Sequence, residues 1–387
     1  MPATSTAPRP GDPALTFLSP DYGGRSLGDV LPAVAHALGA GHSFARPGLV
    51  LPPAQKYVVF LVDGLGHDLL RDHADAAPYL HSLLTEGGTP PLTVGVPSTT
   101  ATSLTSLGTG LTPGEHGMIG FSSRIPGTDD LLFSLLWDDR IDPHEWQPHP
   151  TAFARLEQAG VTTTVVNKRD FEHSGLTRVG NRGATFVGAD SPAEQLAAAV
   201  AATGAAPSLT YLYDSDLDST GHRHGCGSWQ WEDQLAAIDL HVEQVRDVLP
   251  PDVRLLVVAD HGMVDSPPES RLDLAADPAL REGVRIFGGE ARFRQLYCEG
   301  GAADDVAAAW REAVAGRAEV LTRGEAVTRG WFGPLDPTVL PRVGDVLVAA
   351  YDDFTVVDTE RWSFEAELVG FHGSLTRAEM LVPALLA

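Results

Sequence analysis

The sequence predicts an α/β fold in which a mostly parallel central sheet has helices on both faces and carries a smaller α+β cap or insertion. Its apolar runs are short, continuous and rich in β-branched residues, which is typical of strands buried on both faces. Helical stretches lie between these runs, and strands that alternate with helices indicate a parallel sheet. The runs that we expect to form strands are residues 56–62, 163–166, 209–213 and 255–259.

The helices and the domain limits follow from the same pattern. The spacing of apolar residues predicts helices at 27–38, 78–85, 151–158, 192–202 and 229–249. We expect the chain to divide into a flexible or loosely docked arm, a core, and a less regular cap or insertion, over residues 1–20, 21–265 with 366–387, and 266–365. Inside the cap, the pattern predicts a helix near 304–314 and a strand near 345–351.

The charge balance is strongly acidic. There are 27 Lys and Arg residues against 51 Asp and Glu residues, and the formal net charge is −24. An acidic surface repels a phosphate backbone, which argues against a nucleic-acid polymer as a partner. If the substrate is nevertheless an anion, a local source of positive charge must reverse this field.

The number of cysteines and the lengths of the apolar runs exclude several further classes of protein. The two cysteines, Cys226 and Cys298, exclude a disulfide framework and a cysteine-only zinc site. The first twenty residues lack the apolar stretch of a signal peptide, and no run approaches the roughly 20 apolar residues that span a bilayer. We therefore expect a cytoplasmic protein that does not associate with a membrane, and no segment indicates a protein partner.

Acidic side chains follow three of the four predicted strands. Asp63, Asp214 and the pair Asp260-His261 each come directly after an apolar run. In open α/β sheets, ligands bind at the carboxyl ends of the strands, where these side chains would meet. A turn aspartate is the alternative interpretation for Asp63 taken alone.

Two further segments add candidate groups. Residues 97–103 form a hydroxyl cluster that opens a helix, where it either caps the helix or places a nucleophile at its N-terminus. Asp218 and His222 are four residues apart, so one helical turn would aim both at one ion. A solvated acidic loop is the alternative, and His224 is a competing ligand. His372, between two glycines, is the last candidate.

Together these residues have the composition of a metal site. Mixed sets of carboxylates and imidazoles suit zinc or manganese, whereas magnesium and calcium prefer oxygen ligands alone. Six ligands are enough for two divalent ions with open positions, an arrangement known for in-line displacement at phosphorus. The six are Asp63, Asp218, His222, Asp260, His261 and His372.

The order and spacing of these pieces resemble the nucleotide pyrophosphatase/phosphodiesterase branch of the alkaline phosphatase superfamily. The matching segments run from Asp63 to His372 and read VVFLVDG, PSTTATSLTSLGTG-LTPGEHG, DSTGHRHG, VVADHGM and GFHG. The resemblance implies that Thr100 is the nucleophile and a metal ligand. It also implies that one ion is held by Asp63, Asp260 and His261, and the other by Asp218, His222 and His372.

The sequence departs from this family after the nucleophile. Many members have Pro-Asn there, and the asparagine helps to hold the phosphoryl oxygen; this chain has Thr102-Ser103. Ser103 is then the candidate donor to that oxygen. Ser98, Thr99 and Thr102 are alternative nucleophiles because they lie so close to Thr100. A metal-bound hydroxyl loses its proton readily, so the threonine can attack phosphorus and form a phosphorylated intermediate.

The substrate is expected to be a small nucleotide phosphodiester. The resemblance to soluble bacterial phosphodiesterases favours cyclic di-AMP, hydrolysed to pApA and AMP. The alternatives are a nucleotide pyrophosphatase, another phosphodiester or phosphonate hydrolase, and a nucleotide sensor that retains the fold. Lys168 could bind phosphate, although a surface role is its simpler interpretation. Phe121, Phe171 and Tyr213 could stack a base, or each could pack in the core.

Overall fold

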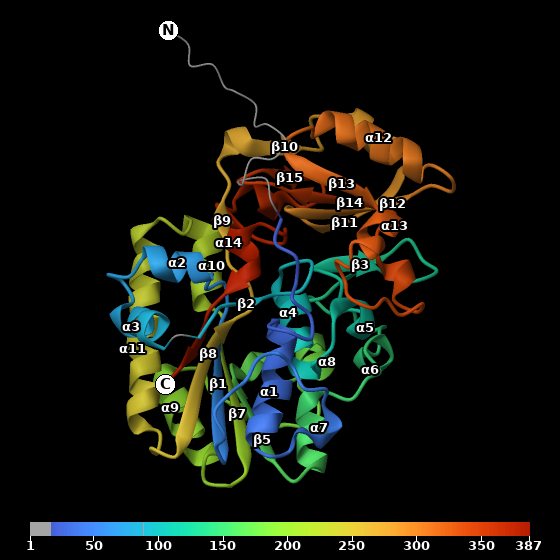
Figure 1. Cartoon of the computed structure of the whole chain (residues 1–387). Helices are drawn as coiled ribbons and strands as arrows, with labels where there is room; N and C mark the ends of the chain where they lie inside the picture. Colours follow the sequence, from blue (N-terminus) through green and yellow to red (C-terminus); the bar gives the residue numbers. More distant parts are fainter. Residues whose placement is uncertain (1–16, 88) are drawn as a thin grey trace.

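The computed structural model describes residues 17–87 and 89–387. Its centre is a six-stranded sheet in the order β18-β8-β1-β7-β5-β6 (Figure 1). All of these strands are parallel except the edge strand β18, which pairs antiparallel with β8. Their bounds are β1 (Lys56–Val62), β5 (Thr162–Asn167), β6 (Thr185–Gly188), β7 (Ser208–Asp214), β8 (Val253–Ala259) and β18 (Ala384–Leu386). The predicted fold class is confirmed, and the four predicted strands are β1, β5, β7 and β8.

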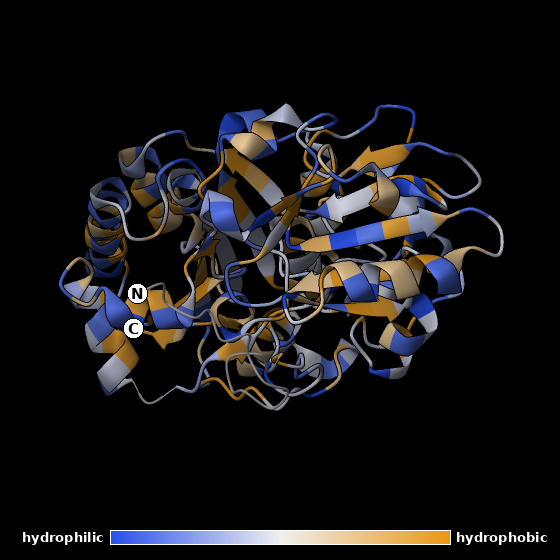
Figure 2. Cartoon of the chain, turned by 90° about the horizontal axis from the view of Figure 1, so that it is seen from above, coloured by the Kyte–Doolittle hydropathy of each residue, from blue (hydrophilic) through white to orange (hydrophobic). Residues whose placement is uncertain are grey.

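Helices cover both faces of this sheet. One layer contains α3 (Pro78–Glu86), α9 (Pro192–Ala202) and α11 (Trp229–Val248), which pack on one another; the other contains α1 (Val30–Ala37), α4 (Thr100–Thr109) and α7 (Ala152–Gln158) (Figure 1). Hydrophilic and hydrophobic segments mix on the outer helices, as Figure 2 shows from above. The predicted helix at 27–38 is a 3-10 turn, Leu27–Asp29, followed by α1.

The register of the central strands sets the position of the acidic residues. Val62 at the end of β1 pairs with Asp214 on one side and with Ala259 on the other. The three strands therefore end at the same level. Asp63 and Asp260, each one residue further on, lie next to each other at the carboxyl edge of the sheet, as the sequence predicts.

A second, antiparallel sheet lies above this edge, and we call it the cap sheet (Figure 1). Its order is β11-β12-β14-β13, with β11 (Val284–Glu290), β12 (Phe293–Cys298), β13 (Ala318–Thr322) and β14 (Val346–Ala350). Helix α12 (Ala303–Ala313) buries Trp310 in a separate hydrophobic cluster between the helix and this sheet, on the side away from the core (Figure 1). The predicted cap helix and cap strand correspond to α12 and β14, while the domain limits stay a prediction.

Short paired strands and short helices join the two sheets. The pairs are β2 (Leu92–Thr93) with β17 (Leu381–Val382), β3 (Ser122–Arg124) with β4 (Leu131–Phe133), β9 (Val264–Asp265) with β16 (Gly370–Phe371), and β10 (Arg271–Asp273) with β15 (Thr355–Val357). The short helices are α2 (His67–Asp72), α5 (Pro113–His116), α6 (Pro143–Trp146), α8 (Gly175–Gly180), α10 (Asp216–His224), α13 (Arg323–Thr328) and α14 (Arg377–Met380).

A buried ion pair attaches the cap sheet to the core. The Arg292 guanidinium donates two parallel hydrogen bonds to the Glu379 carboxylate, at 2.7 and 2.8 Å, and both side chains are completely buried. Arg292 immediately precedes β12, and Glu379 belongs to α14. Bidentate pairs of this kind fix orientation as well as distance.

The first part of the chain is described from residue 17 onward, so most of the predicted arm, residues 1–16, lies outside the described residues. Residues just after it are docked on the core: the Leu18 N–H donates to the Leu375 carbonyl at 2.8 Å, and Phe17 packs edge-on against Trp331. Among the helices formed by residues 17–387 other than residue 88, none has both the length and the apolar character to cross a membrane.

Candidate metal centre

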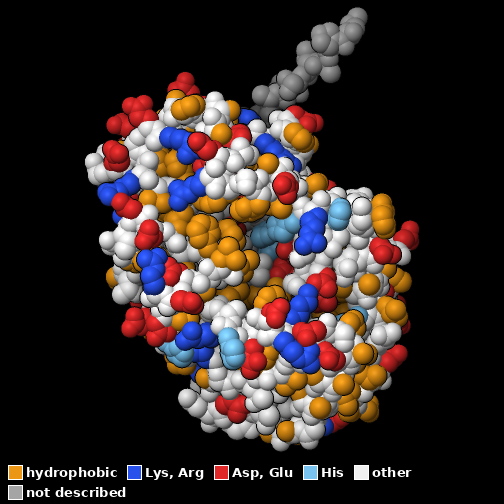
Figure 3. All heavy atoms as spheres, turned by 180° about the vertical axis from the view of Figure 1, so that it is seen from behind, with side chains coloured by type: hydrophobic (Ala, Val, Ile, Leu, Met, Phe, Trp, Pro, Cys, Tyr) orange, Lys and Arg blue, Asp and Glu red, His pale blue; other side chains and the backbone are white. Residues whose placement is uncertain are grey.

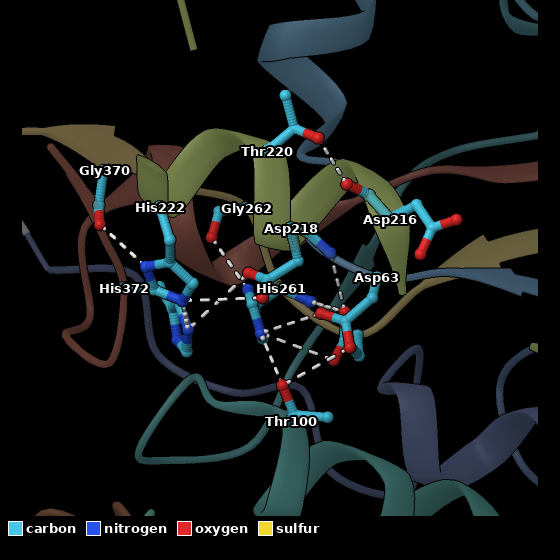
Figure 4. Close-up of polar contacts among 12 residues, drawn as sticks. Asp63, Thr100, Asp216, Asp218, Thr220, His222, His261, Gly262, Gly370 and His372 are labelled. Carbon is cyan, nitrogen blue, oxygen red and sulfur yellow. Dashed lines mark hydrogen bonds and ion pairs between the residues drawn. The ribbon is translucent and has the colours of Figure 1, made fainter. Parts of the chain in front are cut away.

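Residues from five distant segments meet above the carboxyl edge of the central sheet (Figure 4). Asp63 follows β1, Asp260 and His261 follow β8, and Thr100 is the first residue of α4. Asp218 and His222 lie one turn apart on α10, which confirms that their spacing of four is helical. His372 follows β16, and the pairing of β16 with β9 brings it next to the segment after β8.

Two glycines allow this close approach. Gly64 has a φ of 77°, which favours glycine, and a Cβ there would lie 3.0 Å from the Cα and Cβ atoms of Asp218. A Cβ on Gly262 would lie 1.9 Å from the backbone carbonyl oxygen of Ala378. Any larger side chain at either position would push apart the segments that carry the candidate ligands.

The first cluster surrounds Thr100. Its Oγ1 lies 3.2 Å from Nε2 of His261 and 3.5 Å from Oδ2 of Asp63. His261 Nε2 is 3.4 Å from an oxygen of Asp63 and also 3.4 Å from Oδ2 of Asp260. The other oxygen of Asp260 accepts hydrogen bonds from the backbone N–H groups of Gly64 and His261, both at 3.0 Å, and these fix the carboxylate.

The second cluster contains Asp218, His222 and His372. Their ligand atoms all lie within 4.8 Å of one another. His222 Nε2 is 3.4 Å from Asp218 Oδ2 and 3.2 Å from His372 Nε2. Asp218 joins the two clusters, because its ligand atom also lies within 4.8 Å of those of Asp63 and His261.

All three histidines are oriented in the same way. Each ring has its Nδ1 atom against a backbone carbonyl: His222 at 2.8 Å from Gly370, His261 at 3.0 Å from Gly262, and His372 at 3.1 Å from Ser98. A carbonyl only accepts, so Nδ1 carries the proton and donates. Each Nε2 then directs its lone pair into the clusters, the orientation that a backbone carbonyl gives to a metal-binding histidine.

The polar atoms fit divalent cations. Each of the three candidate carboxylate ligands has one buried oxygen that lacks a hydrogen-bond donor among the described residues: Oδ1 of Asp63, Oδ1 of Asp218 and Oδ2 of Asp260. Burial, and next the negative charge of Asp260, raise the pKa of Asp63, and burial also raises the pKa of Asp260. Burial lowers the pKa of His372, which keeps its ring neutral. Unpaired carboxylates beside imidazole nitrogens are a donor set that suits a divalent metal ion.

The hydroxyl groups near Thr100 point elsewhere. Ser98 donates to the Ser374 carbonyl at 2.6 Å, and Thr102 donates to the Met118 carbonyl at 3.1 Å. Ser103 is completely buried, and its Oγ has no hydrogen-bond partner in the described part of the chain. Of these hydroxyls, Thr100 is the one in contact with Asp63 and His261, while Thr99 is the N-cap residue of α4.

Two cavities adjoin Thr100 and share Thr100, Leu135, Asp218 and Ser219 in their walls. The sheet-side cavity, of about 240 Å³, is lined by further residues that include Asp63, Asn167, Phe171, Tyr211 and Tyr213. The cap-side cavity, of about 320 Å³, is lined by further residues that include Phe121, His222, Glu290, Phe364, Phe371 and His372. Figure 3 shows histidines on the floor of a hollow with hydrophobic side chains along one rim.

The residues expected to bind substrate are distributed unevenly. Tyr213 donates its hydroxyl proton to Asp63 Oδ2, and Phe171 packs edge-on against the Tyr213 ring. Phe121 belongs to the cap-side cavity. Lys168 is outside both linings, and its Nζ is paired with Asp216 at 2.5 Å. Ser103 also lies outside both linings.

Glu290, the last residue of β11, is a site residue that the sequence does not predict. Its side chain lies in the cap-side cavity and is 8% exposed, and neither carboxylate oxygen has a hydrogen-bond partner among the described residues. Burial raises its pKa to about 7. The Thr99 hydroxyl and the Phe121 backbone N–H oppose this rise as nearby donors, although neither meets both the distance and the angle of a full hydrogen bond. No motif surrounds Glu290, so the sequence offers no signal for it.

This fold and site define a hydrolase of the alkaline-phosphatase-like class, with candidate metal-binding groups at the carboxyl edge of a mostly parallel sheet. A sequence model of the type I phosphodiesterase / nucleotide pyrophosphatase family matches residues 57–375, more than half of the chain, and the chain belongs to this family. Enzymes of the family are metal-dependent, and membership makes the protein a phosphoric diester hydrolase.

Several solved structures share this fold. Murine ectonucleotide pyrophosphatase / phosphodiesterase 5 has a TM-score of 0.67 and 19% sequence identity, with 86% of this chain and 88% of that chain covered. Phosphonoacetate hydrolase from Sinorhizobium meliloti, in complex with phosphonoformate, has a TM-score of 0.66 and 19% identity, covering 88% and 91%. An inactive threonine-to-alanine variant of the murine protein, in complex with AMP, has a TM-score of 0.66 and 18% identity, covering 86% and 87%.

Proposed function

We propose that the protein is a phosphodiesterase that hydrolyses a small nucleotide diester through Thr100, with cyclic di-AMP as the leading substrate and pApA and AMP as products. The observation that carries the proposal is the position of the Thr100 hydroxyl. It lies at the N-terminus of α4, 3.2 Å from His261 and 3.5 Å from Asp63, and beside two cavities. A diester needs such an arrangement because it carries a group on each side of phosphorus.

Two divalent ions fit the donor set. Asp63, Asp260 and His261 would hold one beside Thr100, and Asp218, His222 and His372 would hold the other. Bound there, the ions would supply positive charge against the phosphoryl oxygens and favour the ionised threonine. Zinc and manganese both suit these ligands, and elemental analysis of the purified protein distinguishes them.

Thr100 and the groups around it account for the steps of the proposed reaction. The Thr100 hydroxyl gives up its proton to a neighbouring acceptor, and His261 Nε2 at 3.2 Å and Asp63 Oδ2 at 3.5 Å are both within reach. The Thr100 Oγ1 then bonds to phosphorus, and the ester bond on the far side breaks. Backbone N–H groups at the start of α4 favour the developing negative charge. Water then hydrolyses the phosphothreonine and restores the hydroxyl.

The nucleoside side of the substrate suits the sheet-side cavity. Phe171 offers an aromatic face there, and Tyr213 forms an adjoining wall while it holds Asp63. Phe121 would contact the other half of the diester. Lys168 and Ser103 line neither cavity, so any effect that they have on the phosphate would be indirect. A cytoplasmic location stays a prediction, and it favours an intracellular diester over an extracellular one.

Phosphonate hydrolysis is the second candidate function. It is supported by the likeness to phosphonoacetate hydrolase, which covers 88% of this chain. A phosphonate such as phosphonoacetate is small, however, and would leave most of the two cavities unfilled.

The deciding experiment compares substrates on metal-loaded protein. We expect hydrolysis of cyclic di-AMP and bis(4-nitrophenyl) phosphate, and much slower hydrolysis of 4-nitrophenyl phosphate and phosphonoacetate. Thr100→Ala should lower kcat by about a thousandfold or more, because the nucleophile is lost. Thr102→Ala, which removes the neighbouring hydroxyl, serves as the matched control. Full activity in Thr100→Ala would refute the covalent route. If the protein cleaved another diester but left cyclic di-AMP intact, cyclic di-AMP would be excluded as the substrate.

A further inference from the structure

The cap-side cavity contains a buried acceptor that the structure leaves without a donor. Glu290 stands in its wall with both carboxylate oxygens unpartnered within residues 17–387, residue 88 aside. An unpaired buried carboxylate costs free energy, so such groups persist where a ligand completes them. His261 and Arg294 act on it electrostatically, but neither forms a hydrogen bond with it; Arg294 donates instead to Glu365 at 2.6 Å and to the Val356 carbonyl.

The surrounding chain makes room for this carboxylate. A Cβ on Gly120 would lie 3.1 Å from Oε1 of Glu290, and one on Gly373 would lie 2.7 Å from its Cγ. Both glycines also have positive φ, at 99° and 128°. Two glycines therefore flank Glu290 and leave the space that its side chain occupies. The surrounding backbone thus accommodates a buried carboxylate at this position.

The wall also carries a group of aromatic and aliphatic side chains. These are Phe121, Leu135, Phe364, Leu368 and Phe371, and Phe364 is 47% exposed at its edge. Such faces suit a flat ring. The polar part of the same wall includes Arg223 and Glu365, but Glu365 already accepts hydrogen bonds from Arg294. An unpartnered carboxylate beside these apolar faces selects for a ring that carries an N–H or O–H donor, because a ring without one leaves the carboxylate unpaired.

The position of the clusters decides which half of the diester this cavity receives. Asp63, next to the attacking Oγ1 of Thr100, lines the sheet-side cavity, whereas His222 and His372 line the cap-side cavity. In an in-line displacement the leaving oxygen departs on the side opposite the nucleophile. The leaving group therefore extends toward His222 and His372, into the cap-side cavity.

We propose that the cap-side cavity is the leaving-group subsite and that Glu290 is its specificity-determining residue, which accepts a hydrogen bond from an amino-bearing nucleobase. This inference rests on the proposed phosphodiesterase function. It adds a second base-binding subsite, so the preferred substrate is a dinucleotide and not a nucleotide with a small leaving group.

Binding measurements test the subsite without any hydrolysis. We expect calorimetry to find two adenosine sites on wild-type protein, of which Glu290→Met weakens one and Phe171→Ala, the matched control in the sheet-side cavity, weakens the other. Purine riboside lacks the amino group and should bind the cap-side cavity about tenfold more weakly than adenosine in wild-type protein, but equally in Glu290→Met, which keeps the length of the side chain and removes both acceptor oxygens. The same amino-group effect in both proteins would overturn the proposal.

Kinetics provide a second, independent test. Glu290→Met, which removes the acceptor oxygens, should lower kcat/KM for cyclic di-AMP about tenfold or more, and change that for bis(4-nitrophenyl) phosphate, whose rings carry no donor, much less. Equal losses on both substrates, or no loss on either, would contradict the assignment. If wild-type protein cleaves no diester, the proposed function fails, while the adenosine measurements still decide the subsite.

Thermal melting separates this role from a structural one. Glu290→Gln removes an unpaired buried charge and keeps the shape of the side chain, so it should melt at or above the wild-type temperature. A lower melting temperature would indicate that Glu290 supports the fold and would overturn the proposal.

Discussion

Arg292 and Glu379 form a fully buried, bidentate ion pair directly behind the loop that carries His372. The same Glu379 carboxylate accepts the backbone N–H of Ser374 at 2.9 Å, so one side chain holds both the cap sheet and this loop. The position of a candidate ligand thus depends on a contact between the core and the cap.

Breaking this pair should destabilise the protein strongly. Arg292→Met leaves the Glu379 charge buried and unpaired, which typically costs about 3–5 kcal/mol of unfolding free energy. Denaturant titration measures the loss. Arg377→Met, which breaks the exposed pair with Asp68, is the control and should cost about 1 kcal/mol or less. A double variant, Arg292→Met with Glu379→Leu, should recover part of the loss; an additive loss would argue against a coupled pair.

Metal should stabilise the protein more at alkaline than at acid pH. The folded pKa of Asp63 is raised by burial and by Asp260. Its protonated form therefore stabilises the metal-free fold, and this contribution disappears as the pH rises through the folded pKa. Divalent ions bind the deprotonated ligands, so the increase in melting temperature on adding Mn²⁺ or Zn²⁺ should be larger at pH 8 than at pH 5.

The control for this measurement is Asp63→Asn, which removes the carboxylate that titrates. It should show a smaller metal-induced increase at pH 8 and a weaker dependence on pH. An increase of equal size in the variant would mean that Asp63 does not contribute to metal binding.

Gly64→Ala should impair the site beyond the cost of backbone strain. Alanine at a positive φ costs about 1–2 kcal/mol, and here its Cβ would also press on Asp218 from 3.0 Å. Gly127→Ala is the matched control, since Gly127 has a φ of 80° and no atom within 4 Å of an added Cβ. Metal affinity should fall in Gly64→Ala alone. Equal affinities in the two variants would show that the contact with Asp218 is unimportant.

Tyr213→Phe should weaken metal binding about tenfold or more, because hydrogen bonds that orient metal ligands have effects of this size. Its hydroxyl donates to Asp63 Oδ2, and the change removes only this oxygen. Tyr211→Phe, on the same strand and in the same cavity, is the control. Isothermal titration with Mn²⁺ gives both affinities, and an unchanged affinity in Tyr213→Phe would rule out this support of Asp63.

The sequence predicts the metal centre better than its surroundings, for a physical reason. Asp63 and Asp260 come directly after buried strands, so the strand pattern alone predicts that they meet. Asp218 and His222 share a helical spacing. Glu290 also ends a strand, but this strand belongs to the antiparallel cap sheet, whose pattern is less regular. Whether a buried carboxylate has a partner depends on contacts between distant segments, and no local pattern reports it.

In the fold, too, some elements are predicted from the sequence and others are not. The continuous apolar runs predict β1, β5, β7 and β8 because these strands are buried on both faces. The edge strand β18 was not predicted, since three residues near the C-terminus form a strand only through their pairing with β8. The sequence likewise predicts one continuous helix where the structure has a 3-10 turn followed by α1, because the spacing of apolar residues does not distinguish a 3-10 helix from an α-helix.

The order of the candidate ligands along the chain has a consequence for synthesis on the ribosome. Asp63, Thr100, Asp218, His222, Asp260 and His261 all precede the cap sheet, whereas His372 follows it. A nascent chain can therefore assemble the cluster around Thr100 before the cap sheet is made, but it lacks the third member of the other cluster. The full set of candidate ligands, and with it the proposed activity, is therefore reached only near the end of translation.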